Sequence, residues 1–109
     1  MAHALLDMLE SVAIRPQMYV APVTFATVQG YLTGLQMGLR FAGIEYSGDD
    51  YAAAARARGW DPRGALGVLR DFEERGIPEE VRIRELVAIE AAAYRRALDE
   101  IRADQHGEV

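Results

Sequence analysis

Cysteine and lysine are both absent from this chain of 109 residues. Without cysteine there can be no disulfide, no thiolate metal site and no thiol nucleophile. All 12 basic residues are arginines, which together with abundant alanine indicates the coding bias of a GC-rich bacterial genome. The two histidines, His3 and His106, lie near opposite ends of the chain with no second ligand at metal-binding spacing. We therefore expect no bound metal and no cofactor.

Catalytic motifs are missing as well. The sequence contains no GxSxG element and no glycine-rich phosphate loop after a strand pattern. With no usable histidine and no cysteine, little remains from which to build a catalytic site. We therefore expect a protein that is not an enzyme.

Positive charge is scarce, and the net charge is −5. An acidic chain is repelled by nucleic acid and by anionic lipid, so neither is favoured as a partner. The first ten residues carry acids where a signal peptide needs positive charge, so we expect a cytoplasmic location. The longest uncharged interval, 16–39, contains glutamines and threonines and is followed directly by Arg40, which argues against a membrane span.

The apolar periodicity predicts an all-α fold, a single-domain bundle of about five helices covering 1–109. One domain is also what this length supports. The predicted helices cover 2–14, 23–43, 49–58, 61–75 and 78–104.

The segment 23–43 predicts the central helix. At about 100° per residue, apolar residues form one stripe and small residues form a ridge roughly 140° away. The stripe contains Phe25, Val28, Leu32, Leu35 and Leu39, and the ridge contains Ala26, Gly30, Gly34, Gly38 and Ala42. Each glycine costs roughly 1 kcal/mol of helix propensity relative to alanine. We therefore expect the three glycines to form an interface at which a neighbouring backbone approaches closely.

Helix ends are marked by capping residues. Gly43 has the position of a C-terminal cap for the central helix. Ser47 and Asp50 have the spacing of a capping box for the next helix. Asp61 followed by Pro62 predicts an N-cap and first helical residue, so we expect the fourth helix to begin there.

Glu90 falls inside the apolar stripe of the last helix, between Val87 and Tyr94. A carboxylate in a core must be paired, hydrogen-bonded or protonated, since leaving it bare costs several kcal/mol. The first interpretation is an ion pair with Arg40 or Arg15. The alternatives are a position at an oligomer or partner interface, or a catalytic acid or base.

The segment from Arg15 to Val20, RPQMYV, resembles the RPGMYIG element of gyrase-type ATPases. Gln17 and Ala21 replace the two glycines of that element, and the next helix lacks the acidic base and metal-binding Asn of those ATPases.

A nearer resemblance is to small uncharacterised bacterial proteins with an RPxMY or RPxMF segment followed by a helix containing Gly-Tyr, here Gly30-Tyr31. It covers about the first forty residues and implies an immunity or antitoxin partner in a polymorphic toxin system. Arg15, Met18 and Tyr19 are then candidate binding residues. The alternative is a connector with Met18 and Tyr19 in the core and Arg15 capping the first helix.

Three functional hypotheses follow. The first is a protein-binding module, either an immunity-type inhibitor of a toxin or a self-associating homodimer, with Val81 and Ile89 exposed on the last helix. The second is a DNA-binding regulator with a helix-turn-helix built from 49–75. The third is a small-ligand pocket between the central and last helices, with Glu90, Arg40 and Tyr94 as polar anchors.

Overall fold

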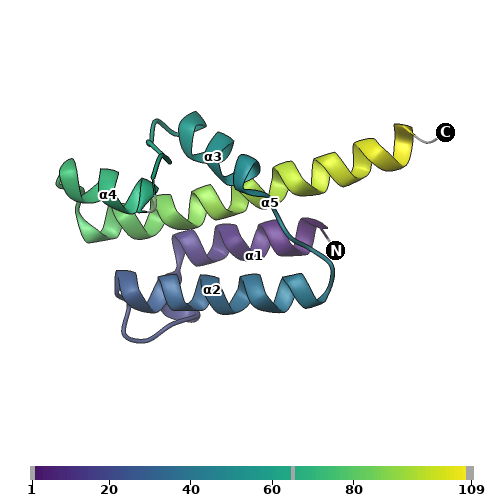
Figure 1. Cartoon of the computed structure of the whole chain (residues 1–109). Coiled ribbons are helices and arrows are strands. Elements are labelled where there is room, and N and C mark those ends of the chain that lie inside the picture. Colours follow the sequence, from purple (N-terminus) through teal and green to yellow (C-terminus); the bar gives the residue numbers. More distant parts are fainter. Residues whose placement is uncertain (1, 65, 108–109) are drawn as a thin grey trace.

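The computed structural model describes residues 2–64 and 66–107, with the side chains of 4–64 and 66–101. Within these residues the chain forms five α-helices, one 3₁₀ turn and no strand, so the predicted all-α bundle is confirmed (Figure 1). The elements in chain order are α1 (Ala2–Ile14), η1 (Pro16–Met18), α2 (Phe25–Phe41), α3 (Gly48–Ala57), α4 (Gly67–Glu74) and α5 (Glu79–Gly107).

Helix α5 is the centre of the bundle. In Figure 1, α1 and α2 lie on one side of α5, and α3 and α4 lie on the other. One apolar cluster joins α5 to α1 and α2, and a second joins it to α3 and α4. The first contains Leu9, Val12, Val28, Leu32, Val87 and Tyr94, and the second contains Ala54, Ala55, Trp60, Phe72, Ile89 and Ala93. Because α5 is apolar on two sides, it divides the interior into two cores.

The prediction that 23–43 is the central helix is therefore wrong. Helix α2 lies at the edge of the bundle and buries only Val28 and Leu32. The ridge of Gly30, Gly34 and Gly38 is exposed, and a Cβ added at any of the three would meet nothing within 4 Å. No neighbouring backbone of the described chain lies against this edge, so the expected close contact within the chain does not exist.

The capping residues at the end of α2 and the start of α3 behave as predicted. Gly43 has φ of +83°, and the amide of Ile44 donates to the carbonyl of Leu39 at 2.8 Å, which closes the α2 terminus. Ser47 accepts from the amide of Asp50 at 3.1 Å, and the Asp50 carboxylate accepts from the amide of Ser47 at 2.9 Å. This reciprocal pair sets the first turn of α3.

The predicted helix start at Asp61 and Pro62 is wrong, because α4 begins only at Gly67. The Asp61 carboxylate accepts from the amide of Arg63 at 3.0 Å and pairs with the guanidinium of the same residue. A local turn thus uses the carboxylate that was expected to cap a helix. The sequence also predicts that Trp60 packs against Ala65 across that helix start, but Ala65 lies outside the described residues. Trp60 packs edge-on against Phe72 with ring centroids 4.7 Å apart.

No helix in the described part of the chain is both long and apolar enough to cross a membrane.

Candidate functional site

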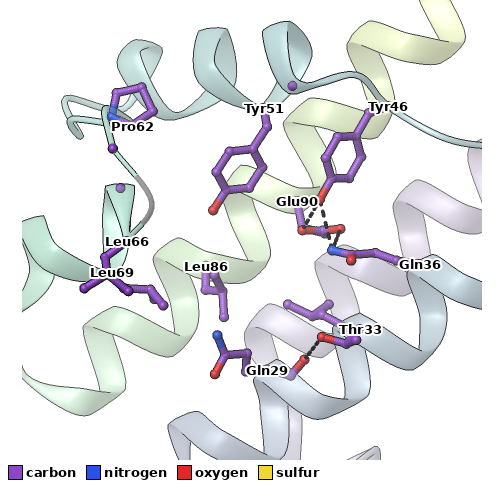
Figure 2. Close-up of a pocket in the computed structure, with 14 residues that line it drawn as sticks. Gln29, Thr33, Gln36, Tyr46, Tyr51, Pro62, Leu66, Leu69, Leu86 and Glu90 are labelled. Carbon is purple, nitrogen blue, oxygen red and sulfur yellow. Dashed lines mark hydrogen bonds between the residues drawn. The ribbon is translucent and has the colours of Figure 1, made fainter.

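Glu90 is the centre of a buried polar network between α2 and α5. Its side chain belongs to a residue only 2% exposed, and each carboxylate oxygen accepts one hydrogen bond. The amide nitrogen of Gln36 donates to Oε1 at 2.6 Å, and the hydroxyl of Tyr46 donates to Oε2 at 3.1 Å (Figure 2). The same Gln36 nitrogen also donates to the Tyr46 oxygen at 2.9 Å. The three side chains therefore form a closed triangle of hydrogen bonds.

The backbone reversal at Gly43 positions Tyr46 in this triangle. Because the chain turns back immediately after α2, Tyr46 lies beside Gln36 of α2 and over Glu90 of α5. The Ser47 cap then starts α3 at once, so the ring of Tyr51 stacks on the ring of Tyr46 at 5.9 Å and 23°. The turn at Gly43 and the helix cap at Ser47 thus bring Tyr46 and Tyr51 to the same side of Glu90.

Burial raises the pKa of Glu90, although the hydrogen bonds from Gln36 and Tyr46 oppose this shift by favouring the charged form. Burial and the nearby carboxylate together raise the pKa of Tyr46, and they raise the pKa of Tyr51 to about 12. Tyr94 also has a pKa raised to about 12, chiefly by burial. All three tyrosines are therefore neutral hydrogen-bonding groups at neutral pH.

A cavity of about 480 Å³ lies beside the triangle, bounded by α2, α5 and the chain from 48 to 69 (Figure 2). Buried residues form its floor, and exposed residues surround its mouth. The floor includes Leu32, Leu86 and Glu90, and the mouth includes Thr33, Gly48, Gly64 and Leu66. A volume of this size falls in the range of small-molecule sites.

Glu90 and Tyr94 lie near each other as predicted, but Arg40 does not pair with Glu90. The Arg40 guanidinium instead pairs with the exposed Glu45 carboxylate at 3.0 Å. Arg40 and Tyr94 line a separate hollow of about 100 Å³, together with Glu45, Gln36 and Tyr46. The predicted ion pair of Glu90 with Arg40 or Arg15 is therefore wrong, and neutral donors take its place.

Arg15, Met18 and Tyr19 lie at η1, away from the Glu90 triangle. Arg15 is exposed and forms no ion pair with a described side chain. Met18 is 71% exposed, so the alternative that placed it in the core is wrong. Tyr19 is half-buried and packs against Tyr31 of α2 with ring centroids 5.9 Å apart.

Ile89 and Val81 are not a pair of exposed residues on α5. Ile89 is 0% exposed and belongs to the core shared with α3 and α4, so the prediction of an exposed Ile89 is wrong. Val81 is half-buried. Ile89 was expected to be exposed because only one apolar side of the last helix was predicted, whereas α5 has a second apolar side that contacts α3 and α4.

The geometry of α3 and α4 differs from a helix-turn-helix, since residues 58–66 separate the two helices. The basic residues that this segment offers for DNA contacts are Arg56, Arg58, Arg63 and Arg70, and three of them are paired with carboxylates. The pairs are Arg58 with Glu85, Arg63 with Asp61 and, at 4.0 Å, Arg70 with Glu74.

Gln36, Tyr46 and Tyr51 belong to the Glu90 site, although the sequence pattern does not predict this role for them. A glutamine in a largely apolar helix and a tyrosine just after a helix cap were the available signals. Neither signal predicts which distant residue the side chain contacts, because Gln36 and Glu90 are 54 positions apart and come together only in the folded chain.

The described residues hold no group of three or more His, Cys, Asp or Glu side chains arranged to bind a metal ion. Comparisons with protein-family models, with curated proteins and with solved structures find no match to this chain. The fold and the site therefore define the chain as an all-α bundle with a buried carboxylate network beside an open cavity.

Proposed function

We propose that this chain is a self-associating protein-binding module, and that the outer face of α2 receives the same face of a second copy. The observation that carries the proposal is the composition of this face. Its exposed residues are Ala26, Gly30, Thr33, Gly34, Met37, Gly38, Arg40 and Phe41. A solvent-facing helix side is normally polar or charged, yet Arg40, at the margin, is the only charged residue here.

Two large apolar side chains project from the face. Phe41 is 90% exposed and Met37 is 57% exposed. Full burial of such a side chain is worth roughly 1.5–3 kcal/mol, so water is an unfavourable environment for both. A partner that covers them recovers this free energy.

The three glycines support a close contact with that partner. Within the chain they bring no packing advantage, because an added Cβ at Gly30, Gly34 or Gly38 would meet open space. Each still lowers helix propensity by roughly 1 kcal/mol relative to alanine. A flat edge on which another helix can lie closely gives these residues a role that the isolated fold does not.

A second copy fits this face in charge and in shape. Two chains of net charge −5 repel each other over most of their surfaces, whereas the α2 face has no acidic residue. In an antiparallel twofold arrangement, Phe41 of each copy would lie over the Gly30 end of the other. Met37 would then lie over Gly34, so each large side chain meets a glycine, where no side chain stands in its way.

The contact is expected to be weak. Helix α2 has 17 residues and is therefore about 25 Å long on a cylinder about 10 Å wide. A face of this size is smaller than the ~800 Å² per partner of a standard interface. We therefore expect a dissociation constant on the order of micromolar.

Sedimentation velocity over a wide range of protein concentration tests the proposal. We expect a monomer–dimer equilibrium in the unaltered chain and loss of the dimer in Phe41→Ser and in Gly34→Leu. Both substitutions are on open surface and should leave the fold intact. The matched control is Ile14→Ser, which removes an apolar side chain that is 68% exposed at the end of α1.

A monomer at every concentration would overturn the proposal. So would a dimer that Ile14→Ser weakens as much as Phe41→Ser does, because the contact would then not be specific to α2.

A further inference from the structure

The cavity beside Glu90 has a polar end and an apolar end. Figure 2 shows the hydroxyl of Tyr51 and the amide of Gln29 pointing into the same space. No hydrogen bond joins either group to another described side chain or backbone. Leu66, Leu69 and Leu86 form the apolar end. An occupant of this cavity therefore needs a hydrogen-bonding head and a hydrocarbon part.

Among the described residues that line the cavity, Glu90 is the only charged one. None of the described arginine side chains forms an ion pair with it. Its two oxygens use one acceptor position each for Gln36 and Tyr46, and a carboxylate offers about four such positions. In its ionised form Glu90 therefore places a negative charge with unused acceptor capacity in the wall, and no cationic side chain of the described residues pairs with it.

The aromatic rings at this end suit a cation as well. Tyr46 and Tyr51 both line the cavity, and their rings stack with centroids 5.9 Å apart. Ring faces attract ammonium groups, with gains of about 0.5–1 kcal/mol at exposed sites and more when water is excluded. A carboxylate with adjacent tyrosines is thus matched to positive charge, and it would repel an anion.

We propose that this cavity binds a small primary ammonium ion that carries an apolar chain. The ammonium group lies at the Glu90 and Tyr51 end and donates to the carboxylate and the hydroxyl. The hydrocarbon part lies against the leucines at the other end. A metal ion is a poorer match, because a single carboxylate supplies too few ligands and the described residues hold no metal-binding cluster.

This inference is independent of the proposed self-association. Of the α2 residues that line the cavity, Thr33 also belongs to the outer face, whereas Gln29 and Gln36 do not. Gly34 and Phe41, which are substituted to test self-association, do not line the cavity. Failure of one proposal therefore leaves the other standing.

Titration by NMR with three probes of similar shape tests it: n-butylammonium, n-butanol and butyrate. We expect saturable binding of n-butylammonium, with perturbed signals confined to the cavity residues. Binding of n-butanol should be at least tenfold weaker, and butyrate should show no saturable binding.

Glu90→Gln keeps the size of the side chain. It should weaken the binding of n-butylammonium at least tenfold and leave the binding of n-butanol unchanged.

Glu45→Gln is the matched control, because it removes one negative charge outside this cavity and should leave binding unchanged. Tyr51→Phe removes only a hydroxyl, and we expect it to weaken the binding of n-butylammonium several-fold. This second variant keeps the proposal testable if Glu90→Gln disturbs the fold.

Three results would each overturn the inference. They are no saturable n-butylammonium binding to the unaltered chain, equal binding of the three probes, and full retention of n-butylammonium binding in both Glu90→Gln and Tyr51→Phe.

Discussion

Replacing the exposed glycines of α2 with alanine should make the isolated chain more stable. In most proteins a glycine buried in a helix contact cannot be enlarged, but a Cβ at Gly30, Gly34 or Gly38 meets nothing within 4 Å here. Only helix propensity then changes, and alanine is favoured over glycine by about 0.8–1.0 kcal/mol in a helix interior. Gly30 and Gly34 are interior, whereas Gly38 lies in the last turn and should contribute less.

The triple substitution Gly30→Ala, Gly34→Ala and Gly38→Ala should therefore raise the free energy of unfolding by about 2–3 kcal/mol. For a domain of this length, 1 kcal/mol corresponds to about 4 °C in Tm. Thermal denaturation followed by circular dichroism should show a rise in Tm of about 8–12 °C, and urea denaturation should show the matching gain in free energy. Both are measured at a protein concentration well below the dissociation constant of any dimer. Binding of a second copy would otherwise add to the apparent stability.

Gly43→Ala is the matched control, since the same chemical change is expected to lower the free energy of unfolding there instead of raising it. Gly43 has φ of +83°, where an L side chain is strained by roughly 1–2 kcal/mol. We expect this variant to melt at a lower temperature. If the triple variant is destabilised as well, the α2 edge must be in close contact within the folded chain, and the reasoning about an open face fails.

Three further substitutions test the interior. Burial raises the pKa of Glu90 above its ordinary value of 4.5, so the folded state holds this proton more tightly. The contribution of Glu90 to stability is therefore fully present below pH 4.5 and is lost as pH rises through the folded pKa. Glu90→Gln should remove that loss, which urea denaturation at a series of pH values would detect, and an unchanged pH profile would contradict it. Phe72→Ala should cost about 3–5 kcal/mol in the same assay, because Phe72 is fully buried between Trp60 and α5; a cost below 1 kcal/mol would contradict the packing of the second core. Glu85→Ala removes the acceptor of the Trp60 indole N–H at 2.8 Å and should cost about 1–3 kcal/mol, with a red shift of tryptophan emission, whereas unchanged emission would refute the contact.

Local signals in the sequence predicted most of the helix ends correctly, because capping depends on residues a few positions apart. Gly43 and the Ser47–Asp50 pair are in place as expected. Asp61 is the exception, since its carboxylate is taken by Arg63 two residues later. Capping and a local turn compete for the same side chain, and the sequence alone does not say which prevails.

The arrangement of the helices could be predicted only in part. Both 23–43 and α5 carry apolar residues over wide arcs, and nothing in the pattern decides which helix has neighbours on two sides. Similarly, the position of Glu90 predicted a buried carboxylate that needs partners, and this much is confirmed. The partners were wrong because Arg40 pairs with the nearby Glu45, which left Glu90 to Gln36 and Tyr46.

The position of α5 also constrains how the chain folds during synthesis. Both apolar cores are completed by α5, and α5 follows the other four helices in the sequence. While α1 to α4 emerge from the ribosome, neither core can close, so their apolar sides remain open to chaperones. Neither core can therefore be completed until the residues of α5 have been translated.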